Sequence, residues 1–235
     1  MMNVTGPAKP LPFVEDTAVA PERLPEYVRR FDEIVKANGT TAGYYGHASV
    51  GCLHIRPLID LKGTEGVERM AAITDQISDL VLEFGGSMSG EHGDGLARSA
   101  LNEKMFGHEI YEAFRRVKGA FDPQGIMNPG KIVDAPSMTE NLKIGPDYKT
   151  LGLSTGFAFS KEGGFAAAVE MCNGQGACRK IHVGTMCPSF MATRDEEHST
   201  RGRANALRAA ISGALPVDAI GSQRLHDVMD LCLGC

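Results

Sequence analysis

GHASVGCLHIRP, at residues 46–57, is the stretch that decides the fold of the first half of this chain. It runs into a segment over 52–60 in which apolar and polar residues alternate, and this alternation predicts a strand with one apolar face. Glycines bracket the connection that precedes it, so we expect a second strand over 41–46 that folds back onto the first. His54 and Arg56 then point together from the polar face.

Helical periodicity surrounds this hairpin. Amphipathic helices are predicted at residues 21–38, 64–84, 96–104 and 108–119. The segment FDPQGIMNPGKI, at 121–132, contains two X-Pro pairs that exclude a regular helix. This mixture predicts an α+β domain over residues 1–133, in which helices pack on an antiparallel sheet.

The second half of the chain has a different texture. Residues 134–162 contain Pro136 and a Gly-Pro pair but no sustained period, which is typical of a linker. Beyond the linker, short predicted helices alternate with cysteine-containing loops. These helices are expected at 163–171, 193–211 and 222–231. We therefore expect a small all-α module over 163–235, truncated at its C-terminal end because the cysteine pattern continues to the last residue.

The composition excludes several classes of protein. A chain of 235 residues with a net charge of −5 lacks the basic footprint of a nucleic-acid-binding protein. No apolar run approaches the roughly 18 residues that span a bilayer. The N-terminus does not place an apolar segment behind a basic one, so no signal peptide is expected. These features predict a cytoplasmic location and leave open a peripheral position at the inner membrane.

Four titratable residues stand in glycine-rich settings. They are His47, His54, Glu91 and His92, the last two within SGEHGDG at 89–95. Two imidazoles and a carboxylate form a usual ligand set for a divalent metal with an open position, and a further imidazole beside the carboxylate can move a proton. The alternative is a pair of unrelated histidines and a solvated polar loop. The spacing alone leaves both readings open.

Five of the six cysteines gather near the C-terminus: Cys172, Cys178, Cys187, Cys232 and Cys235. In a reducing compartment such clusters are more often metal or iron–sulfur ligands than disulfides. Cys187-Pro188 and Cys232-x2-Cys235 match parts of the ferredoxin run C-x2-C-x2-C-x3-C-P, although the spacing from Cys172 to Cys178 does not. We expect a 4Fe–4S cluster here, with a zinc site or free thiols as the alternatives.

Three motifs in one order resemble a known family. GHASVGCLHIRP, GGSMSGEHGDG and FDPQGIMNPGKI, after the opening LPFVEDTAV, are similar to the C-terminal substrate domain of FAD-linked oxidases of the vanillyl-alcohol oxidase superfamily. Within it, the resemblance points to D-2-hydroxy-acid dehydrogenases, including the D-lactate and D-2-hydroxyglutarate enzymes. It covers about residues 1–133. One departure is that residues 49–52 read SVGC where the family usually has GDGN.

This resemblance implies roles for particular residues. A divalent metal, often zinc in the family, would be bound by His47, His54 and Glu91, and His92 would be the general base. Arg56 would grip a carboxylate of the substrate. The residues expected near the flavin are Asn128, Gly130 and Lys131.

The cysteine segment also resembles ferredoxin-like modules fused behind such oxidase domains. In a two-cluster module, Cys187 would join Cys232 and Cys235 in one cluster, and Cys172 and Cys178 would serve the other. A single cluster is the alternative that the spacing leaves open.

The whole pattern predicts a fragment of an FAD-dependent D-2-hydroxy-acid dehydrogenase of the D-2-hydroxyglutarate or D-lactate class. It would oxidise the 2-hydroxyl of a small acid to a keto group and pass electrons through iron–sulfur to a downstream acceptor. The FAD-binding domain would precede this chain, so the fragment alone is expected to be inactive, and the complete protein is expected to be a homo-oligomer. The alternatives are a non-catalytic iron–sulfur docking subunit of a flavoprotein complex and a metal-dependent hydrolase.

Overall fold

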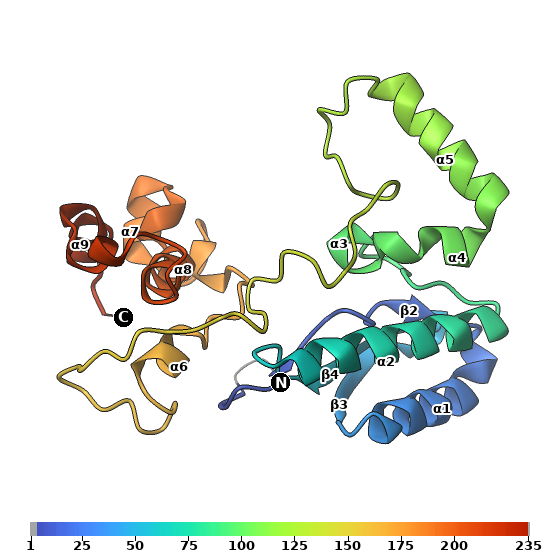
Figure 1. Cartoon of the computed structure of the whole chain (residues 1–235), viewed down its shortest axis with the longest axis horizontal. Coiled ribbons are helices and arrows are strands. Elements are labelled where there is room, and N and C mark those ends of the chain that lie inside the picture. The colour runs from blue at the N-terminus through green and yellow to red at the C-terminus, as the bar shows by residue number, and fades with distance from the viewer. Residues whose placement is uncertain (1–3, 235) are drawn as a thin grey trace. The chain divides into compact units, whose positions relative to one another are not determined.

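The structure is a computed structural model that describes residues 4–234. These residues form two compact units, one over Ala8–Pro146 and one that combines residues 147–234 with residues 4–7. Figure 1 traces both along the chain. None of the described helices has the length and apolar character that crossing a membrane requires. The expected domain limits at 133 and 162 stay predictions.

The first unit is built on a small antiparallel sheet. Its central strand is β4, at Cys52–Ile59, which pairs on one edge with β3, at Ala42–His47. The other edge of β4 pairs with the short strands β1, at Lys9–Pro10, and β2, at Thr17–Ala18. The predicted antiparallel sheet is confirmed, and the glycine-bracketed connection between β3 and β4 is a tight turn.

Two long helices cover the apolar face of this sheet. They are α1, at Leu24–Ala37, and α2, at Thr64–Glu83; Figure 1 shows both running beside β3 and β4. The centre of the core is made of fully buried side chains from these elements: Tyr27, Phe31, Ile55, Ile59, Ile73 and Ile77. Each such side chain stabilises the fold by roughly 1.5–3 kcal/mol through burial alone. The core therefore anchors β4, whose other face is left for polar residues.

Residues 96–104 are helical as expected, but they do not form one continuous α-helix, because a 3-10 turn at Ser99–Leu101 divides the segment. Its two parts are α3, at Gly95–Arg98, and α4, at Asn102–Phe106. Oγ of Ser99 accepts a hydrogen bond from the backbone N–H of Ile132 at 2.9 Å, so this side chain serves a tertiary contact at the break. The following helix, α5, runs over His108–Phe121 and contains no buried residue.

Helices and turns make up the described part of the second unit, with no strand among residues 147–234. The helices are α6 at Phe165–Val169, α7 at Pro188–Thr193, α8 at Thr200–Ile211 and α9 at Gln223–Asp230. Short 3-10 turns lie between them at Ala177–Arg179, Glu196–His198 and Val217–Gly221.

The single helix expected at 193–211 is wrong. Arg194 adopts a left-handed conformation with φ of 62°, which ends α7. Ser199 then caps α8, because its hydroxyl accepts a hydrogen bond from the N–H of Gly202 at 2.9 Å. A Cβ at position 202 would lie 2.0 Å from the carbonyl oxygen of Glu196, so this close turn needs the glycine. Local backbone contacts override the helical period here.

Replacing Phe31 with alanine tests the core. Phe31 is fully buried between α1, α2 and the sheet, so Phe31→Ala is expected to lower the free energy of unfolding by about 3–5 kcal/mol. Urea denaturation followed by hydrogen exchange of β4 peptides measures this in the first unit. Phe121→Ala is the control, because that side chain is 79% exposed and its loss should cost less than about 0.5 kcal/mol. Equal effects of the two substitutions would contradict this description of the core.

Candidate metal centre

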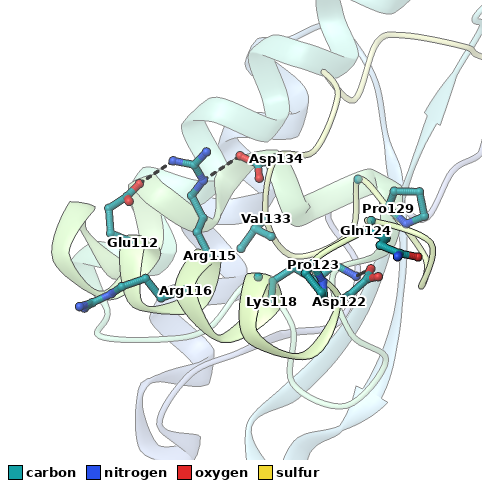
Figure 2. A pocket seen from close by; sticks show the side chains of 13 residues that line it. Glu112, Arg115, Arg116, Lys118, Asp122, Pro123, Gln124, Pro129, Val133 and Asp134 are labelled. Carbon is teal, nitrogen blue, oxygen red and sulfur yellow. Dashed lines mark hydrogen bonds and ion pairs between the residues drawn. The ribbon is translucent and has the colours of Figure 1, made fainter.

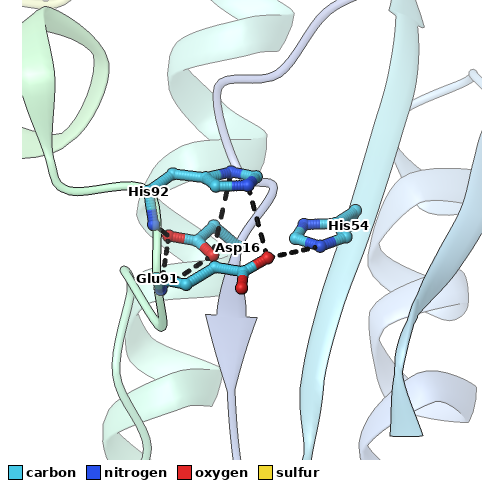
Figure 3. A group of neighbouring side chains, drawn as sticks. All are labelled: Asp16, His54, Glu91 and His92. Carbon is cyan, nitrogen blue, oxygen red and sulfur yellow. Dashed lines mark hydrogen bonds and ion pairs between the residues drawn. The ribbon is translucent and has the colours of Figure 1, made fainter.

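One carboxylate oxygen lies among three histidine side chains. Oε1 of Glu91 is 3.0 Å from Nε2 of His54 and 3.4 Å from Nε2 of His47. The same oxygen is 3.4 Å from Nε2 of His92. Figure 3 shows Glu91 between His54 and His92. The structure thus brings together all four residues that the sequence singled out, and they are not separate polar groups.

The hairpin register delivers the first two histidines to one place. His47 ends β3 opposite Cys52, and Tyr45 stands opposite His54 in β4. The rings of His47 and His54 are 5.3 Å apart between centroids. The loop that carries Glu91 and His92 lies against β2, where Ser87 pairs with Ala18, and so reaches the polar face of the sheet.

Two distances from Glu91 fit a shared metal ion, although the side chains whose ligand atoms all lie within 4.8 Å of one another are Asp16, His54, Glu91 and His92, without His47. Ligand atoms bind zinc at about 2.0–2.2 Å, so two of them at tetrahedral angles lie about 3.4 Å apart. The separations of 3.0 and 3.4 Å from Glu91 to His54 and His47 agree with this. His54 is buried, whereas the side chains of His47 and Glu91 are 58% and 46% exposed. A small substrate can therefore approach an ion held by these residues from the solvent side.

Asp16 holds the loop that carries Glu91 and His92. Its carboxylate is fully buried and accepts hydrogen bonds from the N–H of His92 at 2.8 Å, the N–H of Glu91 at 3.1 Å and the hydroxyl of Ser89 at 2.8 Å. Burial raises the pKa of Asp16, but these hydrogen bonds outweigh it, so the pKa lies below its ordinary value. Asp16 also has a left-handed φ of 74°, a strain that the contacts to the loop offset.

Glu15 contacts both His92 and Arg56. Its Oε1 lies 3.2 Å from Nδ1 of His92, and its Oε2 accepts a hydrogen bond from Nε of Arg56 at 2.8 Å. The side chains of Glu15 and Arg56 are largely buried, at 9% and 13% exposed, whereas that of His92 is 43% exposed. Because Arg56 already pairs with Glu15, its expected contact with a substrate carboxylate stays a prediction.

Sequence reasoning missed both of these acids. The signal was present in LPFVEDTAV at 11–19, where two adjacent acids interrupt an apolar stretch. Both side chains are buried just before β2, and a buried carboxylate needs hydrogen-bond donors. The donors are distant in sequence: His92 is 76 positions from Asp16, and Arg56 is 41 positions from Glu15. No local sequence pattern identifies these hydrogen-bond donors.

The residues expected near a flavin lie on the loop that follows α5. Gly130 lines a cavity of about 670 Å³ between this loop and α5, where Figure 2 shows Arg115 between Glu112 and Asp134. Asn128 and Lys131 do not line this cavity. Asn102 links the end of this loop to the segment that follows Glu91 and His92. Its Nδ2 donates to the carbonyl of Ile132 at 2.9 Å and to the carboxylate of Asp94 at 3.2 Å.

Four of the five expected iron–sulfur ligands line one cavity of about 730 Å³ in the second unit: Cys172, Cys178, Cys187 and Cys232. The fifth, Cys235, lies outside the described residues. Among the residues that the structure describes, no three cysteine sulfurs lie within 4.8 Å of one another. Four thiolates on a single zinc ion would be about 3.8 Å apart, and the described cysteine sulfurs are not gathered to that spacing.

A chain with this sheet and this histidine–carboxylate centre can now be compared with known proteins. It belongs to the family described as FAD linked oxidases, C-terminal domain, whose model matches residues 1–132. Membership in this family implies FAD as the cofactor of the protein.

Curated relatives extend the similarity beyond this domain. The chain is 39% identical over 227 residues to D-2-hydroxyglutarate dehydrogenase of Pseudomonas putida, a match that covers 94% of this chain and 22% of the relative. It is 37% identical over 213 residues to the Escherichia coli protein of the same name, covering 88% and 20%. D-lactate dehydrogenase of Archaeoglobus fulgidus is 36% identical over 133 residues, or 56% of this chain and 29% of the relative. The chain thus spans about a fifth of the length of the first two relatives.

Removing the Asp16 carboxylate should release the loop. Asp16→Ala leaves the N–H groups of Glu91 and His92 without their acceptor, and we expect the amides of residues 87–92 to exchange with solvent at least about tenfold faster, as a loss of roughly 1.4 kcal/mol requires. Hydrogen-exchange mass spectrometry measures this. Asp79→Ala, an exposed acid on α2, is the matched control. Unchanged protection of the loop in Asp16→Ala would contradict the role given to this carboxylate.

Proposed function

We propose that this chain is the substrate-side part of an FAD-dependent D-2-hydroxy-acid dehydrogenase of the D-2-hydroxyglutarate class. The 2-hydroxyl of the substrate becomes a ketone, and the electrons leave through FAD and an iron–sulfur cluster. The observation that carries the proposal is the convergence of three imidazole nitrogens on Oε1 of Glu91, all within 3.4 Å. The relatives that match this chain across both units bear the name D-2-hydroxyglutarate dehydrogenase, which supports the substrate class.

His47, His54 and Glu91 would hold a divalent metal. Two nitrogen donors and one oxygen donor suit zinc, and the three leave a coordination position for a substrate oxygen. When bound, such an ion polarises the 2-hydroxyl and lowers its pKa. A protein that only docked another flavoprotein would have no use for this ligand set, which favours the enzyme over the docking subunit.

His92 would take the proton of the 2-hydroxyl. Its Nδ1 lies 3.2 Å from Oε1 of Glu15, and a proton held on Nδ1 by that carboxylate would leave the lone pair on Nε2. That Nε2 points toward the metal ligands, 3.4 Å from Oε1 of Glu91. Glu15 thereby sets the tautomer in which His92 can act as a base on a hydroxyl at the metal centre.

Arg56 and Glu15 set the charge of the substrate pocket. The guanidinium favours a carboxylate of the substrate, while its bond to Glu15 offsets part of that positive charge. FAD, which a domain outside this chain would mainly bind, would supply the hydride acceptor for the C2 hydrogen of the substrate. Asn128, Gly130 and Lys131 are the residues of this chain that we expect closest to it.

Cys172, Cys178, Cys187 and Cys232 would bind a 4Fe–4S cluster. Their common cavity supports one cluster site in this part of the chain. Cys235, which lies outside the described residues, stays a predicted further ligand. A cluster held here would supply one-electron transfer to an acceptor outside the chain. The metal centre would thus perform the proton chemistry, and the second unit would provide the electron exit.

Metal binding separates an enzyme from a docking subunit. We expect His54→Ala to weaken binding of Co²⁺ at this centre by more than about 100-fold, beyond what loss of a supporting contact costs. Titration followed by visible absorption measures it, and thiolate charge-transfer bands distinguish binding at the cysteines. His92→Ala is the matched control and should retain affinity within a few-fold, because His92 is not assigned as a ligand. If the wild-type chain binds no Co²⁺ through nitrogen and oxygen ligands, the result would favour the docking subunit over the enzyme.

The base is tested in the complete enzyme. His92→Ala should lower kcat for D-2-hydroxyglutarate by about 10²–10⁴-fold while the metal content stays the same. Steady-state kinetics with an artificial electron acceptor, together with metal analysis, measure both quantities. A His92→Ala enzyme with near wild-type kcat would show that another group removes the proton.

A further inference from the structure

Arg203 is a buried cation at the wall of the cysteine cavity. It lies on α8, is 5% exposed and lines the cavity together with the four described cysteines. Its Nε donates to the carbonyl of Val228 at 2.9 Å, and its Nη1 donates to the carbonyl of His198 at 2.7 Å and to Oγ of Ser189 at 3.1 Å. Nη1 is also 3.8 Å from Sγ of Cys187. These contacts fix the guanidinium in one position.

The charge of Arg203 has no counter-ion among the described residues. No carboxylate of residues 4–234 forms an ion pair with it, and its buried Nη2 has no hydrogen-bond partner there. Other arginines of this unit pair with glutamates: Arg179 and Arg201 with Glu196, and Arg224 with Glu197. Leaving a guanidinium buried without an anion costs several kcal/mol, so a group that occupies the cavity is the natural source of negative charge.

Polar donors face the sulfur atoms around Arg203. Sγ of Cys187 lies 3.2 Å from Oγ of Ser189 and 3.8 Å from Nη1 of Arg203. A second sulfur, that of Cys178, faces the backbone N–H of Arg201 at 3.4 Å. The cavity is therefore built to stabilise sulfur-centred negative charge.

We propose that Arg203 is the fixed counter-charge of the iron–sulfur cluster, with Nη2 donating to a sulfur of the cluster or of its ligands. The inference rests on the proposed function, because it requires a cluster in this cavity. When reduced FAD gives one electron to the cluster, the cluster becomes more negative by one charge. A nearby buried cation stabilises that form and raises the reduction potential. Arg203 thereby makes the cluster a better acceptor of electrons from the flavin.

The experiment uses the complete protein that contains this chain, purified without oxygen. Iron and acid-labile sulfide are measured first, and the midpoint potential is then obtained by redox titration followed by electron paramagnetic resonance. Arg203→Gln removes the charge, and Arg203→Lys keeps it with fewer donors. Arg194→Gln is the matched control, because Arg194 is exposed and does not line the cavity.

We expect a more negative potential in Arg203→Gln, a smaller shift in Arg203→Lys and none in Arg194→Gln. The counter-charge role of Arg203 would also be supported if the Arg203→Lys protein retained a cluster and the Arg203→Gln protein did not. A wild-type protein without iron and sulfide would remove the iron–sulfur part of the proposed function. A loaded Arg203→Gln protein with the wild-type potential would overturn the role of Arg203 alone. Unfolding of the second unit in both Arg203 variants would also overturn this role, because it would show that Arg203 is needed for packing and not as a counter-charge.

Discussion

The carboxylate of Asp16 is the contact on which the rest of the candidate site depends. This buried carboxylate accepts hydrogen bonds from the backbone N–H groups of Glu91 and His92. It thereby fixes a glycine-rich loop that has few side chains of its own to pack. A loop of this kind would otherwise sample many conformations. With the loop held, Glu91 and His92 lie beside two histidines from a distant hairpin.

Strand β4 carries the other half of this arrangement. Ile55 and Ile59 are fully buried under α1 and α2, so the strand is anchored by the core of the first unit. His54, the neighbour of Ile55, points to the opposite face because successive side chains alternate along a strand. Its position is therefore fixed by the packing of residues that have no part in the chemistry. Functional groups on such rigid elements keep their geometry better than groups on loops alone.

Much of the fold was predictable from local signals. The alternation over 52–60 and the glycines before it predicted the hairpin, and long apolar periods predicted α1, α2 and α5. The breaks within 96–104 and 193–211, which helical periodicity does not predict, have one cause. At Ser99 and at Ser199, hydroxyl groups form hydrogen bonds to backbone atoms at a break in the helix, and periodicity does not register such contacts.

The sequence by itself determined the chemical types available: imidazoles and a carboxylate in glycine-rich motifs, and cysteines gathered near the C-terminus. Only the tertiary structure decided which of them meet. It put Nε2 of three histidines around one oxygen of Glu91, placed Glu15 behind His92, and left Arg203 beside the cysteines without a carboxylate. The physical reason is that burial forces charged groups to find partners, and those partners are chosen by distance in space and not by distance along the chain.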